Sequence, residues 1–406
     1  MLLLYNTAIR IYYVIIWIFS FFNKKAKLWI SGRNKQSFIR QKDAIWFHFS
    51  SLGEFEQGRP VLEAMRQNYP ENKIVITFFS PSGYEVRKNT ILADAVYYLP
   101  LDTARNAKEF LDFIQPKLVI FTKYEYWYNF FKEMYRRDIP LYIISGIFRP
   151  GQIFFKWYGG LHRKMLGFVT WFFVQDDKSK QLLKKLGKEQ VTVSGDTRFD
   201  RVWENSFAPK ELPNIAAFKN GQKVFVAGST WPEDEYLLAE LITEYSGWKF
   251  IIAPHEIDND QLDRLMELLP TKSSARYSII SNLNGNFNNL RVLVIDNIGM
   301  LSSLYQYGEI AYIGGGFGAG IHNTLEAAAF GLPVIFGPNY ARFKEANELV
   351  ALRAGFSINN AEQLSEIMNT LVNDAAFYSA ANKKILAYVQ EHTGATNSIL
   401  NHIEKK

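Results

Sequence analysis

A glycine-rich stretch in the second half of the chain contains residue types that could bind a nucleotide. A predicted apolar strand, Ile310 to Ile313, leads into a turn with five glycines: Gly314, Gly315, Gly316, Gly318 and Gly320. His322 and Asn323 then open a predicted helix that carries Glu326 in its first turn. Such a backbone can approach a phosphate closely, and Glu326 is placed to accept hydrogen bonds from a ribose diol. We predict a nucleotide-binding half-domain here; the alternative is a packed turn that binds nothing.

A turn in the first half presents a carboxylate just after a predicted strand. Ser51, Gly53 and Glu54 follow the strand Ile45 to Phe49, where Gly53 permits a tight turn and a helix begins. Ligands of open α/β sheets bind at the carboxyl ends of strands, so Glu54 is placed to deprotonate an attacking hydroxyl as a general base. The alternative is that Glu54 only complements the helix dipole, which contributes about 0.3–1 kcal/mol.

Glu125 has a similar position after the predicted strand Leu118 to Thr122. Aromatic residues that could form a wall for a sugar or an acyl chain surround it: Tyr124, Tyr126, Trp127 and Tyr128. We predict that Glu125 lies on the same side of the sheet as Glu54. The alternative is that the aromatic residues belong to the core and that Glu125 is solvated.

Further polar residues follow other predicted strands. Arg149 and Arg198 could each bind a carboxylate or a phosphate through two hydrogen bonds, although a single arginine is more often a surface residue. Ser229 and Thr230 precede a helix start and form a second candidate phosphate site. His255 ends the next strand and could contact the nucleotide, although a lone histidine is more often structural.

The amino terminus is apolar from Leu2 to Phe22 and is followed by a basic cluster. The cluster consists of Lys24, Lys25, Lys27, Arg33, Lys35, Arg40 and Lys42. We predict that residues 1–22 form a membrane anchor, either spanning or lying in the interface, with the rest of the chain in the cytoplasm. A cleaved signal peptide fits poorly because the basic residues come after the apolar run. A helix packed in the core is the alternative.

Composition narrows the possible chemistry. The chain has 406 residues, no cysteine, six histidines and a net charge of +6. The absence of cysteine excludes disulfides, thiolate metal sites and thiol catalysis, and the scattered histidines predict no metal site. The positive charge favours an anionic partner, but no nucleic-acid recognition motif accompanies it.

Short apolar strands alternate with helical stretches along most of the chain, which is typical of parallel sheets covered on both faces. Seven strands are predicted between residues 45 and 194, and five between residues 224 and 336. The breaker-rich stretch 205–221 predicts an interdomain linker. We therefore expect an α/β protein with two doubly wound domains facing a cleft, at residues 44–204 and 221–390.

The order of several motifs resembles that of the bacterial Kdo transferases. The motifs are HFSSLGEFEQGRPVLEAM, TFFSPSGYE, YEYWYN, GDTRFDRV, GSTWPEDE, APHEID, DNIGMLSSLY and GGFGAGIHNTLEAAAFGLPVIFGPN. The likeness extends from about Ala44 to Gly355. Enzymes of that family transfer 3-deoxy-D-manno-octulosonic acid (Kdo) from CMP-Kdo to a lipid A precursor. The resemblance implies a GT-B glycosyltransferase whose first domain binds the acceptor and whose second domain binds CMP-Kdo.

The resemblance also implies roles for individual residues. Glu54 matches the catalytic base, and Glu125 matches an acidic residue of the acceptor-side cleft. The predicted donor-binding residues are Arg198, Ser229, Thr230, His255, Gly299, Gly316, His322, Asn323 and Glu326. The predicted acceptor-binding residues are Ser51, Gly53 and Arg149.

Three segments depart from the family pattern. The run Asp296 to Leu301 differs at the positions expected near the cytosine. The segment Glu125 to Asn129 lacks a proline, and an arginine common near Pro254-His255 is missing. These departures affect details of donor and acceptor geometry.

The implied reaction is a direct inverting displacement. Glu54 would remove a proton from a glucosamine hydroxyl of lipid IVA, and CMP would leave with its charge stabilised by the glycine turn and the helix dipole at Asn323. We expect no cofactor and no metal, because one phosphate carries less charge than two. The expected location is the cytoplasmic side of the cell inner membrane. The alternatives are a GT-B enzyme that uses another nucleotide sugar, a UDP-sugar epimerase and a catalytically silent, membrane-tethered lipid A-binding protein.

Overall fold

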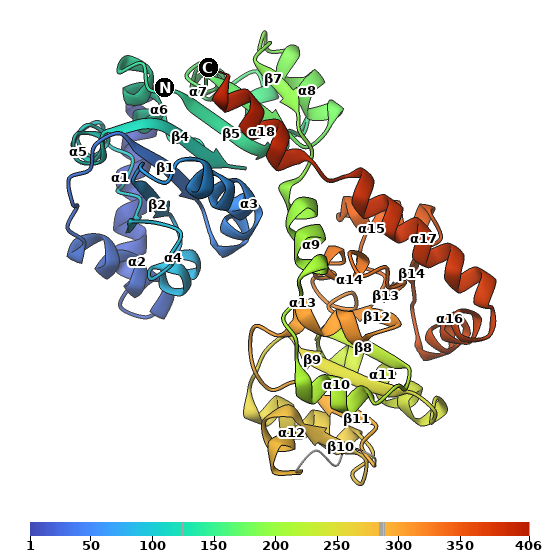
Figure 1. Cartoon of the computed structure of the whole chain (residues 1–406). Helices are drawn as coiled ribbons and strands as arrows, with labels where there is room; N and C mark the ends of the chain where they lie inside the picture. Colours follow the sequence, from blue (N-terminus) through green and yellow to red (C-terminus); the bar gives the residue numbers. More distant parts are fainter. Residues whose placement is uncertain (124, 284–286, 288, 406) are drawn as a thin grey trace. The chain divides into compact units, whose positions relative to one another are not determined.

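The chain divides into two units, each built on one seven-stranded sheet (Figure 1). The computed structural model describes residues 1–123, 125–283, 287 and 289–405. The first unit comprises Met1–Arg201 and His392–Lys406, and the second comprises Val202–Glu391.

The first sheet is parallel throughout and has the order β3-β2-β1-β4-β5-β6-β7. Its strands are β1 (Ala44–Phe49), β2 (Ile74–Phe78), β3 (Ala95–Tyr98), β4 (Pro116–Thr122), β5 (Leu141–Gly146), β6 (Trp171–Val174) and β7 (Val191–Val193). All six residues of β1 are buried. Ile45 and Phe47 pack into the core on one face of the sheet and Trp46 into the core on the other, because side chains alternate along a strand. A strand covered on both faces is therefore apolar at nearly every position.

The helices of the first unit cover both faces of its sheet. They are α1 (Leu2–Phe19), α2 (Lys24–Lys35), α3 (Leu52–Asn68), α4 (Pro81–Arg87), α5 (Ala104–Ile114), α6 (Tyr128–Arg136), η1 (Ile153–Phe155), α7 (Gly160–Leu166), α8 (Asp177–Lys184), α9 (Thr197–Phe207), which continues into the second unit, and α18 (Ala395–Glu404). The last helix, α18, was not predicted. It returns to the first sheet and buries Ile399 and Ile403 in the same core cluster as Phe47 (Figure 1).

Helix α1, the predicted anchor, is docked on the first unit along one side. The Tyr5 hydroxyl donates to Asp102 (2.6 Å), and the Asn129 side chain donates to Asn6 (3.2 Å). Within α1, which is described in full, only Ile9 is buried. The helix is long and apolar enough to cross a membrane by length and composition. The helix thus packs on the protein, as the alternative proposed, but its low burial is not that of a core helix.

The second sheet is also parallel throughout, with the order β10-β11-β9-β8-β12-β13-β14. Its strands are β8 (Val224–Thr230), β9 (Lys249–Pro254), β10 (Ser274–Arg276), β11 (Val292–Val294), β12 (Ile310–Ile313), β13 (Val334–Phe336) and β14 (Gly355–Ser357). Its helices are α10 (Pro213–Lys219), α11 (Pro232–Glu244), α12 (Asn259–Leu268), η2 (Tyr277–Leu283), α13 (Leu301–Leu304), η3 (Tyr305–Tyr307), α14 (Leu325–Ala328), α15 (Lys344–Ala351), α16 (Ala361–Asn373) and α17 (Ala375–Glu391).

The stretch 205–221, predicted to be a linker, is mostly folded. It contains the end of α9 and the whole of α10, whose Ile215 and Phe218 are fully buried. Pro213 occupies the start of α10, a position where proline is favoured because the first helical amides have no partner within the helix. Pro213 therefore marks a helix start in the second unit and not an open linker.

Candidate active site

The two predicted catalytic glutamates follow the two strands at which the order of the first sheet reverses. β1 and β4 are neighbours there, and ligands of open α/β sheets bind at such a point. Glu54 lies in the first turn of α3, where the Ser51 hydroxyl donates to its carboxylate. Glu125 lies three residues beyond the end of β4. Both carboxylates are thus carried by one edge of the sheet, as predicted.

Glu125 is not a solvated surface residue. Its Oε2 lies 2.5 Å from Nε2 of His48 and accepts a bond from the Trp127 indole at 3.3 Å. The Glu125 side chain is 16% exposed, whereas His48 is buried within β1. His48 was missed in the sequence. The available signal was a single polar side chain in an otherwise apolar strand, Ala44–Phe49.

The aromatic wall predicted beside Glu125 is only partly present. Tyr128 is buried and Tyr126 packs against the core, as the alternative reading proposed. Trp127 is partly exposed; its ring lies 5.0 Å from that of Phe79, and its N–H reaches Glu125. Tyr124 lies outside the described residues.

Gly53 does not form the tight turn predicted for it. It lies inside α3, and its φ is not positive. A Cβ at this position would meet only the Ser51 hydroxyl, at 3.7 Å. Arg149, the other predicted acceptor ligand, is exposed and its backbone N–H donates to the Gln152 side chain (3.0 Å).

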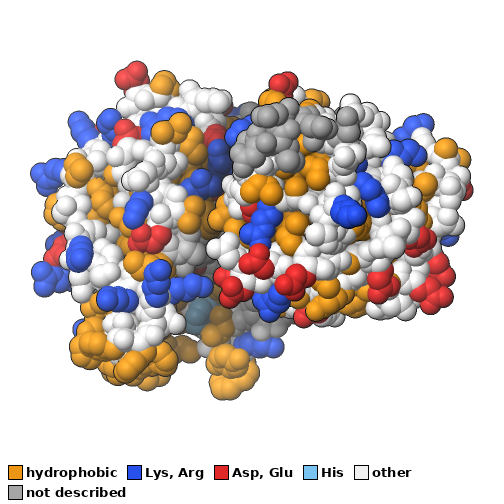
Figure 2. All heavy atoms as spheres, turned by 90° about the horizontal axis from the view of Figure 1, so that it is seen from below, with side chains coloured by type: hydrophobic (Ala, Val, Ile, Leu, Met, Phe, Trp, Pro, Cys, Tyr) orange, Lys and Arg blue, Asp and Glu red, His pale blue; other side chains and the backbone are white. Residues whose placement is uncertain are grey.

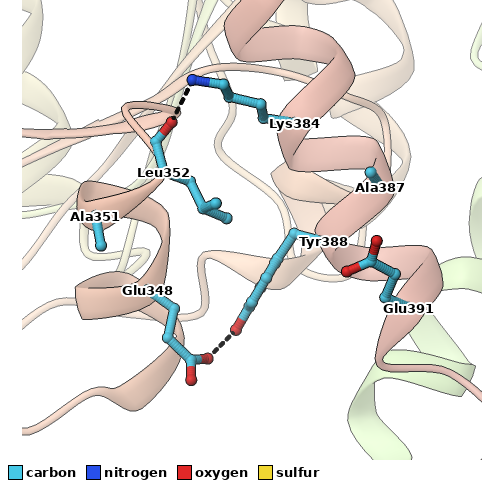
Figure 3. Close-up of a pocket in the computed structure, with 7 residues that line it drawn as sticks. All are labelled: Glu348, Ala351, Leu352, Lys384, Ala387, Tyr388 and Glu391. Atoms are coloured by element: carbon cyan, nitrogen blue, oxygen red, sulfur yellow. Dashed lines mark hydrogen bonds between the residues drawn. The ribbon is translucent and has the colours of Figure 1, made fainter.

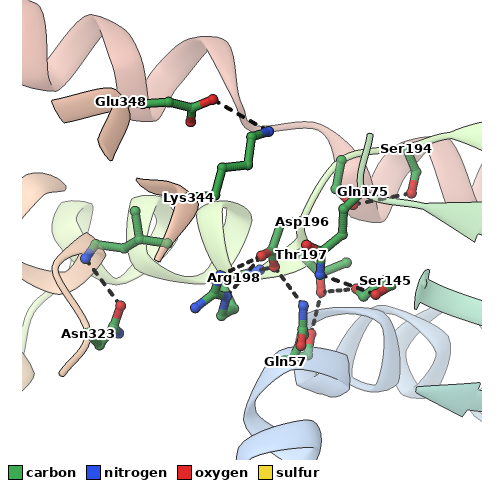
Figure 4. Close-up of polar contacts among 12 residues, drawn as sticks. Gln57, Ser145, Gln175, Ser194, Asp196, Thr197, Arg198, Asn323, Lys344 and Glu348 are labelled. Carbon is green, nitrogen blue, oxygen red and sulfur yellow. Dashed lines mark hydrogen bonds and ion pairs between the residues drawn. The ribbon is translucent and has the colours of Figure 1, made fainter. Parts of the chain in front are cut away.

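Arg198 belongs to the first unit, where a polar network holds its guanidinium (Figure 4). Its Nε and Nη2 donate to Oδ2 of Asp196 at 2.9 and 2.8 Å, and Gln57 donates to the other oxygen of Asp196 at 2.8 Å. Burial alone would raise the pKa of Asp196, but the charge of Arg198 and its hydrogen bonds outweigh burial and lower it. The guanidinium of Arg198 is thus held in place by an ionised carboxylate.

In the second unit, the glycine-rich turn lies at the corresponding reversal point between β8 and β12. A Cβ on Gly314 would lie 2.2 Å from the Ser229 carbonyl, and one on Gly316 would lie 2.5 Å from the Gly337 amide. Only glycine allows the backbones to pass this closely. The turn therefore needs its glycines for packing inside the protein, as the alternative reading proposed.

Most of the amides expected to face a phosphate are already bonded inside the turn. The backbone N–H groups that donate to acceptors of the second unit are those of Gly314, Gly315, Gly318, Gly320 and His322. Helix α14, which carries Glu326, has only four residues. These five amides are therefore already engaged within the protein and are not available to a phosphate in this conformation.

A buried carboxylate in α11 organises the turn. Asp234 accepts hydrogen bonds from the Tyr312 hydroxyl (2.7 Å), the Gly315 amide (2.9 Å) and the Trp231 amide (2.9 Å). Burial raises the pKa of Asp234, and these three bonds to its charged form oppose the rise. Asp234 was not singled out in the sequence, because its neighbours Glu233 and Glu235 make it resemble an ordinary acidic helix start.

Two of the predicted donor ligands, His255 and His322, are brought together with Trp231. The two imidazole rings stack with their centres 4.1 Å apart, and His255 also stacks on the Trp231 ring at 4.9 Å. The Trp231 indole N–H donates to Nε2 of His322 at 3.0 Å. Because an indole nitrogen can only donate, Nε2 must be unprotonated, and neutral His322 carries its proton on Nδ1.

The remaining predicted donor ligands lie on the same edge of the second sheet. The Asn323 side chain donates to Glu326 (3.1 Å), so these two residues are paired. Thr230 is buried and donates to Glu235 (3.0 Å), whereas Ser229 is partly exposed with a positive φ of 54°. Gly299 follows β11 and is exposed.

A separate cavity of about 400 Å³ lies between α15 and α17 (Figure 3). Its lining residues are Glu348, Ala351, Leu352, Lys384, Ala387, Tyr388 and Glu391. Tyr388 donates to Glu348 at 2.6 Å, and Lys384 donates to the Leu352 carbonyl at 3.1 Å. None of the predicted site residues lines this cavity.

Comparison with known proteins agrees with the motif order. Residues 25–201 match the family described as 3-deoxy-D-manno-octulosonic-acid transferase (kdotransferase). The chain is 28% identical to the 3-deoxy-D-manno-octulosonic acid transferase of Haemophilus influenzae, over 88% of this chain and 86% of that protein. It is 27% identical to the Aquifex aeolicus protein of the same name, over 84% and 89%. The chain is therefore similar to named Kdo transferases over most of its length.

One relative is longer than this chain. The chain is 26% identical to a bifunctional glycosyltransferase/methyltransferase of Fusobacterium nucleatum, and it covers 62% of that protein's length. Among solved structures, the UDP-GlcNAc 2-epimerase of Neisseria meningitidis superposes with a TM-score of 0.60 over 89% of this chain and all of the epimerase. Because the identity is only 16%, this likeness shows the fold alone, and it confirms the predicted GT-B architecture.

Acid should destabilise the second unit through His322. Burial, with a smaller contribution from His255, lowers the pKa of His322 to about 4, whereas an unfolded histidine has a pKa of about 6.5. Between these values the unfolded chain binds more protons, so stability falls as the pH drops through this range. Urea unfolding at about pH 7.5 and pH 5 measures how much the free energy of unfolding falls between the two. We expect a smaller fall in His322→Gln than in the wild type, because glutamine accepts the Trp231 N–H but cannot titrate. Equal losses in both proteins would contradict this prediction.

Proposed function

We propose that this chain transfers Kdo from CMP-Kdo to the lipid A precursor lipid IVA in lipopolysaccharide biosynthesis, with inversion at the anomeric carbon. The similarity to named Kdo transferases supports Kdo transfer in this pathway. The observation that carries the finer proposal is the placement of Glu54 and Glu125 at the reversal point of the first sheet.

In the proposed reaction, Glu54 takes the proton of a glucosamine hydroxyl of the acceptor. The hydroxyl oxygen bonds to the anomeric carbon of Kdo, and the bond from that carbon to the phosphate oxygen breaks. CMP leaves with both electrons of that bond as a phosphate monoester. These steps account for all atoms and electrons without a cofactor or a metal. A transfer rate that is unchanged by added chelator would support a metal-free reaction.

The donor side of the proposal relies on side chains of the second unit. The Nδ1–H of His322 is a donor in a fixed orientation, and Ser229 offers a partly exposed hydroxyl near the end of β8. Glu326 would accept from the ribose. In the first unit, Arg198 has its guanidinium oriented by Asp196 and is suited to bind an anionic group.

We place the protein on the cytoplasmic face of the inner membrane, with α1 lying in the interface. Tyr5, Tyr12 and Tyr13 contact the first unit along the helix, so α1 cannot leave it to span a bilayer alone. Its other side exposes apolar residues, including Leu4 (72%) and Phe22 just beyond its end (89%). Hydrophobic side chains gather at the lower left edge of Figure 2, with Lys and Arg side chains next to them.

Polar substitutions on the exposed side of α1 should weaken membrane binding without unfolding the protein. We expect the triple variant Leu4→Ser, Trp17→Ser and Phe22→Ser to sediment less with anionic vesicles, because each lost apolar side chain removes buried area worth about 25 cal/mol per Å². Activity on a detergent-dispersed acceptor should change much less. A variant that sediments as fully as the wild type would contradict the interfacial anchor.

The transfer assay tests the function directly. CMP-Kdo generated in situ is supplied with tetraacyl lipid A precursor, and the product is detected by mass. A product one or more Kdo units heavier supports the proposal. Absence of product from a folded, CMP-binding protein would contradict it and favour another acceptor or a silent binder. Competition between CMP and UDP for binding separates the proposal from a UDP-sugar enzyme.

A further inference from the structure

A chain of hydrogen bonds runs through the interior of the first unit and ends at Glu125. The Trp46 indole donates to the Thr77 hydroxyl at 2.8 Å, and that hydroxyl lies 2.8 Å from Nδ1 of His48. Nε2 of His48 lies 2.5 Å from Glu125. Trp46, Thr77 and His48 are all buried, and His48 and Thr77 are cross-strand partners on β1 and β2.

The chemistry of the first link determines where the proton of His48 lies. The indole of Trp46 can only donate, so the Thr77 oxygen accepts there and its own hydrogen remains to be donated. The Phe47 carbonyl is 3.5 Å away, at the limit of a hydrogen bond, whereas Nδ1 of His48 is much closer. Thr77 therefore donates to Nδ1, and neutral His48 carries its proton on Nε2, facing Glu125.

The result is a carboxylate with one oxygen fully engaged. Both N–H donors, from His48 and Trp127, converge on Oε2 of Glu125. Within the described part of the chain, Oε1 accepts no hydrogen bond and so remains for a ligand. Arg33 of α2 and Tyr12 of α1 also interact electrostatically with this carboxylate.

We propose that His48 is a positioning residue that fixes the Glu125 carboxylate, with Oε1 directed at the hydroxyl of the acceptor. This inference rests on the proposed function, because it assigns Glu125 to acceptor binding. His48 itself does not touch the substrate, since it is buried behind Glu125. An N–H donor stabilises the charged form of a carboxylate, so its removal should make the site easier to protonate.

The pH dependence of transfer tests the inference. His48→Phe removes the donor, and the acidic midpoint of the transfer rate should move upward by about one to two pH units, since a bond to a charged group contributes about 1.5–3 kcal/mol. His48→Gln places an amide N–H near the position of Nε2 and should restore the wild-type midpoint. An unmoved midpoint in His48→Phe, or a Gln variant that behaves like Phe, would overturn the proposal.

A spectroscopic measurement keeps the inference testable if the transfer assay or a variant fails. Nitrogen-15 spectra of the histidines of the wild-type protein should show a neutral His48 with its proton on Nε2, and Glu125→Gln should shift that proton signal. A proton on Nδ1 would overturn the proposal. If the wild type shows this tautomer but no Kdo transfer, the proposed function fails and the hydrogen-bonded pair stands.

Discussion

Glu54→Gln should lower the rate of Kdo transfer by about 10²–10⁴-fold, the range that a positioned general base contributes. Glutamine keeps the shape of the side chain and can still accept the Ser51 hydroxyl bond. It cannot take a proton from the acceptor. Binding of CMP should stay within a few fold, because the groups that we assign to the nucleotide lie in the second unit. Single-turnover rates and calorimetric CMP binding measure the two quantities separately.

A matched substitution on the same helix distinguishes catalysis from helix stability. Glu63 also lies on α3, is paired with Arg59 and is 33% exposed. Glu63→Gln should leave the transfer rate unchanged. If Glu54 only complements the helix dipole, Glu54→Gln should cost about 0.3–1 kcal/mol of stability and leave the rate intact. Loss of rate and CMP binding in equal measure would indicate a folding role.

The strands were predictable because their environment is uniform. A parallel strand covered on both faces is apolar at nearly every position, as β1 and β2 are. The missed strands, β10 and β14, have three residues each and contain serine. They pair at the sheet edges, where the apolar signal is weakest.

The local chemistry of the site was predictable only in part, because it depends on contacts between distant residues. Glu54 and Glu125 could be placed from the strands that precede them. The pairing of Glu125 with His48 joins residues 77 positions apart, and no spacing rule reveals it. The return of α18 to the first unit depends on distant contacts in the same way. Asp200 accepts hydrogen bonds from the amide and the hydroxyl of Thr396, which lies 196 positions later in the chain.

The glycine turn shows a different limit. Its composition is equally suited to a phosphate cradle and to close crossing of three backbone segments. The close backbone contacts of the structure show the second use for Gly314 and Gly316, because neighbouring backbones occupy the space that a Cβ would need. A glycine-rich composition indicates that the backbone closely approaches another group. Only the fold shows whether that group is a ligand or another backbone segment.

Asp234→Ala should destabilise the second unit by about 3 kcal/mol or more and weaken CMP binding at least tenfold. The substitution leaves the Tyr312 hydroxyl and the amides of Gly315 and Trp231 without their acceptor, and each unsatisfied buried group costs about 1–3 kcal/mol. Binding weakens because Trp231, once released, no longer fixes the orientation of His322. Urea unfolding and calorimetric CMP titration measure the two effects.

Two further variants separate the role of Asp234 from that of a general acidic residue at a helix start. Tyr312→Phe removes one of the three bonds and should cost about 1 kcal/mol, with CMP binding nearly unchanged because Gly315 and Trp231 remain held. Glu233 shares the first turn of α11 but is exposed, so Glu233→Ala should cost at most about 1 kcal/mol through the helix dipole. If Asp234→Ala lowered stability and CMP binding no more than Glu233→Ala, glycine packing alone would hold the turn. The buried carboxylate would then have no part in forming the donor site.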